Sequence, residues 1–168
     1  RGLVGSEMCI RDRAGSPVVL RSYTTDATLG VLNEKAAWLD SFKVASVPIE
    51  SEVSFKYLHD MAVPEIVGIP SVPHKPIQVT EEKVLRFGML EGDAVVHATW
   101  AVYDPQNAHG PAPFGANGST ASHLTIVLNS WEATQLADMS DASPEIIAPI
   151  LAAKEKAEVV IIKICLLY

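Results

Sequence analysis

Polar side chains stand where three apolar runs of the chain end. Asp104, Asn129 and Lys163 each follow such a run, and Glu132 comes three residues after Asn129. Ligands of parallel α/β sheets bind beyond the carboxyl ends of the strands, so neighbouring strands would gather two carboxylates, an amide and an amine at one edge. Carboxylates can hold Mg²⁺, usually through its waters, and a helix amino terminus favours anions. These residue types predict a site for phosphate transfer.

Each of these residues also has a purely structural interpretation. Asn129 could cap a helix that begins at residue 130, and Glu132 would then complete a capping box. Asp104 and Pro105 could form an ordinary turn at a strand end, and Lys163 could be an ordinary surface lysine. The sequence alone leaves both interpretations open.

The elements that hold these residues alternate between strand and helix. Their strands are continuous apolar runs, which are typical of a parallel sheet with helices on both faces. We therefore predict an α/β fold with a three-layer, mostly parallel sheet. The expected strands of this sheet are 17–23, 94–104, 124–128 and 158–163, with helices at about 130–138 and 143–157.

The first half of the chain predicts a strand–helix unit and a small β flap or lid, which we place within about residues 44–90. The stretch 52–59 alternates apolar and polar residues as a half-exposed strand does. The other expected elements are strands 43–49 and 83–90 and a helix from Thr25 or Asp26 to Phe42. We also expect irregular chain over 64–76, a turn at 91–93, a loop over 105–119 and a short helix near Ser119.

Composition narrows the classes of function. The net charge of −7 argues against nucleic acid as the main partner, since phosphate backbones call for a basic surface. No apolar run approaches the ~20 residues that span a bilayer, so we expect no membrane partner and a cytoplasmic location. The two cysteines and five histidines lack metal-ligand spacing, and no Walker A or GxGxxG motif is present.

Both ends of the chain look foreign to the rest. "SEMCIRDR" (6–13) and "CLLY" (165–168) resemble translated sequencing-adapter read-through, and such segments are kept out of fold reasoning. We therefore expect a non-native leader over 1–13, a partial α/β domain over 14–163, and a non-native tail over 164–168.

The stretch from "AVYDPQNAHG" through "HLTIVLNSWEATQL" to "AEVVIIK" resembles the ribokinase-like PfkB carbohydrate kinases. In that family a strand ending in Asp-Pro precedes a strand ending in Asn-x-x-Glu, and a further strand leads to a nucleotide loop. The resemblance covers about 94–163 and implies transfer of the ATP γ-phosphate to a sugar hydroxyl. It also implies ATP and Mg²⁺ as cofactors and a possible homodimer through the β lid.

The resemblance assigns a role to each strand-end residue. Asn129 and Glu132 would organise Mg²⁺ and the nucleotide phosphates, with Glu132 as the metal ligand. Asp104 would lie near the sugar substrate, and Lys163 would stand at the threshold of the nucleotide loop.

The chain also departs from the family. Gln106 stands where many relatives have Asn, and the stretch between Gly92 and Tyr103 is short for a strand–helix–strand unit. The family's Gly-Gly motif and its Gly-Ala-Gly-Asp motif, with the catalytic base, are absent from these residues. We therefore expect a kinase fragment without activity of its own. The alternatives are a non-catalytic sugar- or nucleotide-binding domain, and an α/β domain in which Asn129 and Glu132 only cap a helix.

Overall fold

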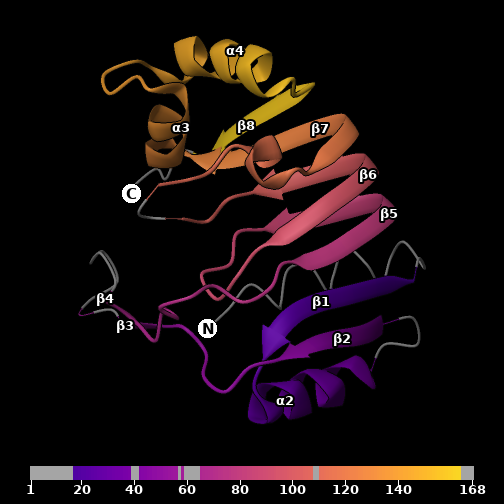
Figure 1. Ribbon diagram of the computed structural model, residues 1–168. Helices are drawn as coiled ribbons and strands as arrows, with labels where there is room; N and C mark the ends of the chain where they lie inside the picture. The colour runs from indigo at the N-terminus through magenta and orange to yellow at the C-terminus, as the bar shows by residue number, and fades with distance from the viewer. Residues whose placement is uncertain (1–16, 39–41, 57, 59–64, 108–109, 164–168) are drawn as a thin grey trace. The chain divides into compact units, whose positions relative to one another are not determined.

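The computed structural model describes residues 17–38, 42–56, 58, 65–107 and 110–163 (Figure 1). The segments expected to be non-native, 1–13 and 164–168, lie outside these residues. The chain divides after Ile69 into two compact units, which we describe separately.

The first unit is built around a short parallel pair of strands. Strands β1 (Val18–Thr24) and β2 (Phe42–Pro48) pair in parallel and are joined through helix α2 (Asp26–Ala36). Thr25 caps the helix, because its hydroxyl accepts the N–H of Thr28. The apolar spacing had predicted a helix that extends to Phe42. The helix ends before Phe42, which is instead the first residue of β2.

A separate antiparallel pair forms the rest of the first unit. Strand β3 (Ser54–Lys56) pairs with β4 (Glu65–Val67), which lies in the range expected to be irregular. Among the described residues, the pair β3 and β4 is the part of the predicted β flap that the structure contains. Strand β2 belongs instead to the parallel pair, and residues 77–87 belong to the main sheet.

The second unit contains a four-stranded parallel sheet in the order β5-β6-β7-β8. The coarse prediction of an α/β fold with a parallel sheet is confirmed, including the parallel pairing of the last two strands. Strand 17–23 was expected in the same sheet, and this was wrong because β1 pairs with β2 in a separate sheet. Residues 91–93, which were expected to form a turn between two strands, lie in the connection 88–93 between β5 and β6, which are parallel. The strands are β5 (Ile77–Phe87), β6 (Ala94–Asp104), β7 (Thr120–Asn129) and β8 (Val159–Lys163).

Strands β5, β6 and β7 bend sharply at one shared level of the sheet. A straight strand of eleven residues would be roughly 33 Å long, whereas the connection 88–93 can reach only roughly 25 Å back to the start of β6. The pairing register skips Glu82, Thr99 and Ser122, which are adjacent across the three strands. The bend lets a short, helix-free connection join two parallel strands (Figure 1).

The alternation of buried and exposed side chains along β6 shifts by one residue at the same level of the sheet. Ala94 and Val96 point inward before the bend of β6, whereas Ala101 and Tyr103 point inward after it. A straight strand would keep one parity throughout, because successive side chains point to opposite faces. Both halves of the bent strand therefore contribute to one interior.

The helices of the second unit complete this interior on the side of β7 and β8. A 3-10 turn, η1 (Phe114–Asn117), precedes β7, so the short helix expected near Ser119 lies a few residues earlier. Helices α3 (Ser130–Ala137) and α4 (Pro144–Glu155) follow β7 (Figure 1). The main buried side chains are Leu124, Ile126 and Leu128 of β7, Ala133 and Leu136 of α3, and Ile147 and Leu151 of α4.

Strand β8 departs from its expected burial. It lies at the edge of the sheet, and Val159 and Ile161 are each 47% exposed, although the apolar run had predicted a fully buried strand. On the same outward-facing side of the sheet, Leu85 and Trp100 are also exposed.

Candidate functional site at the carboxyl edge of the sheet

The strand-end residues predicted from the sequence come together in the structure. Asn129, the last residue of β7, is paired in register with Lys163, the last residue of β8. The Lys163 amine donates to Oδ2 of Asp104, the last residue of β6, at 2.8 Å. The carboxyl ends of three adjacent strands therefore bring a carboxylate, an amide and an amine to one edge.

Asn129 and Glu132 form a complete capping box at the start of α3. The side-chain oxygen of Asn129 accepts the Glu132 N–H at 2.8 Å, and Oε2 of Glu132 accepts the Asn129 N–H at 2.9 Å. The structural interpretation of this pair thus describes its local geometry well. Capping alone does not account for everything that surrounds the Glu132 side chain.

Glu132 is far more buried than a cap requires, with only 2% of the residue exposed. Its second oxygen, Oε1, accepts the backbone N–H of Asn107 at 3.0 Å. Burial raises the pKa of Glu132, and the Asp104 carboxylate adds to the rise, while the Asn129 N–H, the Lys163 charge and the Asn107 N–H oppose it. The fold therefore keeps two carboxylates close together at a cost to ionisation.

Asp104 supplies an oxygen that has no hydrogen-bond partner among the described residues. The residue is 6% exposed, and its Oδ1 atom is buried without a hydrogen bond while Oδ2 accepts from Lys163. Buried carboxylate oxygens are normally satisfied, so this atom points to a missing donor, water or cation. Mg²⁺ commonly uses one or two carboxylates together with waters and phosphate oxygens, and Asp104 beside Glu132 fits that donor set.

The turn that follows Asp104 carries contacts that sequence reasoning missed. Pro105 is fully buried, Gln106 has a left-handed φ of 43°, and Asn107 then donates its backbone N–H to Glu132. Gly88 lies against this turn and donates its N–H to the Asp104 carbonyl at 2.9 Å. A backbone donor has no residue-type signature, and only the "FG" at the end of β5 hinted at a close approach.

Arg86 anchors the far end of the same loop from inside the bent sheet. Its guanidinium donates to the Phe114 carbonyl and the Ser119 hydroxyl, each at 3.1 Å, and pairs with Asp93 at 2.7 Å. It also lies over the Tyr103 ring, 4.7 Å from the centroid. Burial raises the pKa of Tyr103 to about 12, and the Tyr103 hydroxyl donates to the Ala112 carbonyl.

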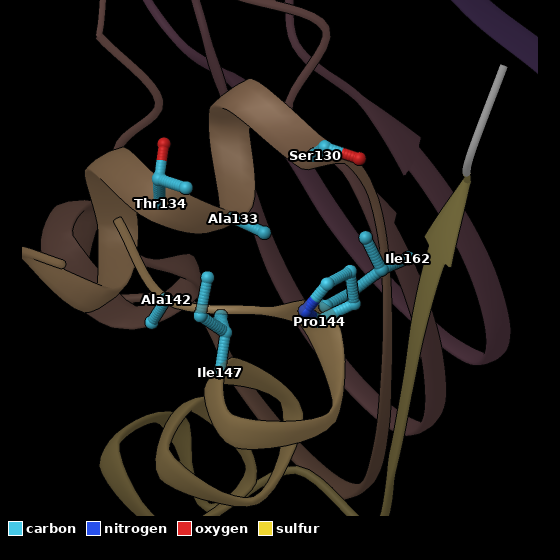
Figure 2. Close-up of a pocket in the computed structure, with 7 residues that line it drawn as sticks. All are labelled: Ser130, Ala133, Thr134, Ala142, Pro144, Ile147 and Ile162. Atoms are coloured by element: carbon cyan, nitrogen blue, oxygen red, sulfur yellow. The ribbon is translucent and has the colours of Figure 1, made fainter. Parts of the chain in front are cut away.

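An apolar pocket of about 300 Å³ lies beside the carboxyl edge, on the helix side of β8 (Figure 2). Figure 2 shows Ala133 of α3 and Ile147 of α4 pointing into it, with Pro144 beside Ile162. Ile162 and Lys163 are consecutive in a strand, so their side chains point to opposite faces. The pocket therefore offers apolar walls, whereas the charged groups lie on the other side of β8.

Comparison with known proteins gives no relative: no family model, curated protein or solved structure matches this chain. Among the described residues, no three His, Cys, Asp or Glu side chains gather as a ready-made metal site. None of the helices in that part of the chain is long and apolar enough to span a membrane.

Proposed function

We propose that this chain is part of an ATP- and Mg²⁺-dependent carbohydrate kinase of the ribokinase-like PfkB class, and that Asp104, Glu132 and Lys163 bind magnesium and nucleotide phosphates. The observation that carries the proposal is the unpartnered buried oxygen of Asp104, which lies in a cluster whose members all end adjacent parallel strands or begin the next helix. A structural turn has no use for such an oxygen, whereas a hydrated cation does.

Each residue has a distinct task in this proposal. Asp104 and Glu132 would hold Mg²⁺, partly through waters, and Asn129 would orient phosphate oxygens at the start of α3. The Lys163 amine, which neutralises Asp104 in the free protein, would turn to a phosphate once the cation takes its place. Bound Mg²⁺ supplies neutralisation of phosphate charge.

The resemblance also leaves a departure to account for. The six residues 88–93 between β5 and β6 hold no helix, unlike the crossovers of a doubly wound sheet. The resemblance therefore rests on β6, β7, α3 and β8, which carry the residues that we assign to the site. With the family's catalytic base absent, we expect residues 1–168 to bind phosphates and to show no ATP-dependent phosphorylation of sugars.

The completed capping box supports a second candidate, a domain in which Asn129 and Glu132 serve structure and the edge binds no metal. Calorimetric titration of the full chain with magnesium tripolyphosphate separates the two. We expect binding, and we expect Asp104→Asn to weaken it tenfold or more, about 1.4 kcal/mol. The matched control is Asp138→Asn at the other end of α3, where Asn also tolerates the left-handed φ of 58°. If the wild type does not bind magnesium tripolyphosphate, or if both variants bind it equally well, the structural interpretation of the site is favoured.

A further inference from the structure

We propose that Gly88 is a positioning residue for the carboxyl-edge site: its missing side chain allows the turn 104–107 to set Asp104 and the Asn107 N–H against Glu132. The claim that Gly88 matters for ligand binding rests on the function proposed above. The claim that Gly88 sets the path of the turn concerns the free protein and can be measured without a ligand.

The turn approaches Gly88 more closely than any side chain would permit. A Cβ atom on Gly88 would lie 1.6 Å from the carbonyl oxygen of Pro105, 2.6 Å from its carbonyl carbon and 3.3 Å from its Cα. All three are backbone atoms, so no rotamer change can relieve the collision. Gly88 does not have a left-handed φ, and what it supplies is therefore room rather than conformational freedom.

This approach fixes the path of the chain on both sides of Pro105. On one side, the Gly88 N–H holds the Asp104 carbonyl at 2.9 Å, which extends the β5–β6 ladder by one bond. On the other side, Gln106 takes a left-handed φ, which costs roughly 1–2 kcal/mol for a residue with a side chain. That conformation turns the Asn107 N–H toward Glu132.

Hydrogen bonds to backbone groups hold the far end of the loop. Phe114 is held through both of its backbone groups, its carbonyl by Arg86 and its N–H by Glu155 at 3.1 Å. The Ala112 carbonyl is held by the Tyr103 hydroxyl at 2.9 Å. A methyl group added at Gly88 must therefore push the buried Pro105 peptide, and the residues that move with it are those that contact Glu132.

The test compares Gly88→Ala with Gly115→Ala in the full chain. Gly115 lies in η1 of the same loop, and a Cβ there meets nothing within 4 Å. We expect Gly88→Ala to speed hydrogen exchange of the Asn107 amide tenfold or more. Gly115→Ala should leave this exchange rate unchanged.

The ligand experiment keeps this proposal separate from the proposed function. In a protein that binds magnesium tripolyphosphate, Gly88→Ala should lose affinity tenfold or more, whereas Gly115→Ala should not. If the wild type binds no tripolyphosphate but exchange of the Asn107 amide is faster in Gly88→Ala, the positioning role stands and the proposed function fails. If exchange of the Asn107 amide is the same in Gly88→Ala and wild type, the positioning role is wrong.

The wild-type protein offers a second test should Gly88→Ala fail to fold. If the turn is one rigid piece, the amides of Gly88 and Asn107 should open together, with protection factors within about threefold of each other. Exchange of Asn107 that is more than tenfold faster than that of Gly88 would show that Gly88 does not hold the turn, and it would overturn the proposal.

Discussion

Replacing Glu132 with Gln removes the charge of the buried carboxylate and changes little of its shape. Burial and the neighbouring Asp104 raise the pKa of Glu132 in spite of two backbone N–H groups that donate to it. The folded protein therefore holds the protonated form more readily than the unfolded chain does. Glutamine mimics that form, because it keeps one carbonyl acceptor and places a donor where the second oxygen stood.

The sign of the effect on stability follows from linkage. Because the folded pKa lies above the unfolded one, the contribution of Glu132 to stability is complete below the unfolded value, about 4.3, and is lost as the pH rises through the folded value. At about pH 7 we expect Glu132→Gln to be at least as stable as wild type. The gain in unfolding free energy should be about 1.36 kcal/mol for each pH unit by which NMR finds the pKa raised.

The competing expectation has the opposite sign. If the hydrogen bonds to Glu132 stabilise the charged form more than burial disfavours it, Glu132→Gln should be less stable than wild type. The Asn107 N–H would then face the amide group of Gln, which costs about 1–3 kcal/mol of unfolding free energy. The unfolding free energies of wild type and Glu132→Gln, measured by denaturant unfolding at about pH 4 and about pH 7 with hydrogen exchange of the β6 and β7 amides as the readout, decide between the two expectations. A loss above about 1 kcal/mol at about pH 7 would refute the reasoning. Glu155→Gln is the matched control, since Glu155 accepts the Phe114 N–H at 3.1 Å and should show no such gain.

Three further outcomes follow from the same contacts. Asp104→Asn should lower the unfolding free energy by no more than ~1 kcal/mol in denaturant melts, because its partner Lys163 is half exposed, and a larger loss would make the pair mainly structural. Arg86→Met should cost about 3–5 kcal/mol in the same assay, because it leaves the partners of a buried guanidinium unpaired, and an unchanged midpoint would contradict this. Between about pH 10 and 12 the wild type should lose roughly 2–3 kcal/mol that Tyr103→Phe does not lose, because the unfolded tyrosine ionises first, and equal losses would place Tyr103 in solvent.

Local patterns in the sequence determined the site residues and the elements that carry them. The β-rich run before Asn129, and Glu132 three residues later, predicted a strand, a helix start and a capping box, and all three are present. Strand ends carry their polar residues to the same edge of any parallel sheet, so the approach of Lys163 to Asp104 could also be expected. Short-range spacing suffices for such features because a helix or strand fixes it.

The bend of the sheet was decided only by the tertiary structure. Residues 94–103 are almost all apolar, so the change of burial phase at Thr99 leaves no mark in the sequence. The same bend allows β5 and β6 to pair in parallel, because it shortens the distance that residues 88–93 must cross. It also brings the buried Arg86 side chain to the partly exposed Asp93 carboxylate.

The fine geometry of the site likewise depended on contacts between distant segments. The sequence gives Gly88 no link to Pro105, and the N–H of Asn107 exists at every residue except proline. The depth at which Glu132 is buried depends on how α3 and the loop after Asp104 pack together. Residue types thus determined which groups can do chemistry here, and packing between distant segments decided which of those groups lie buried, charged and unpartnered.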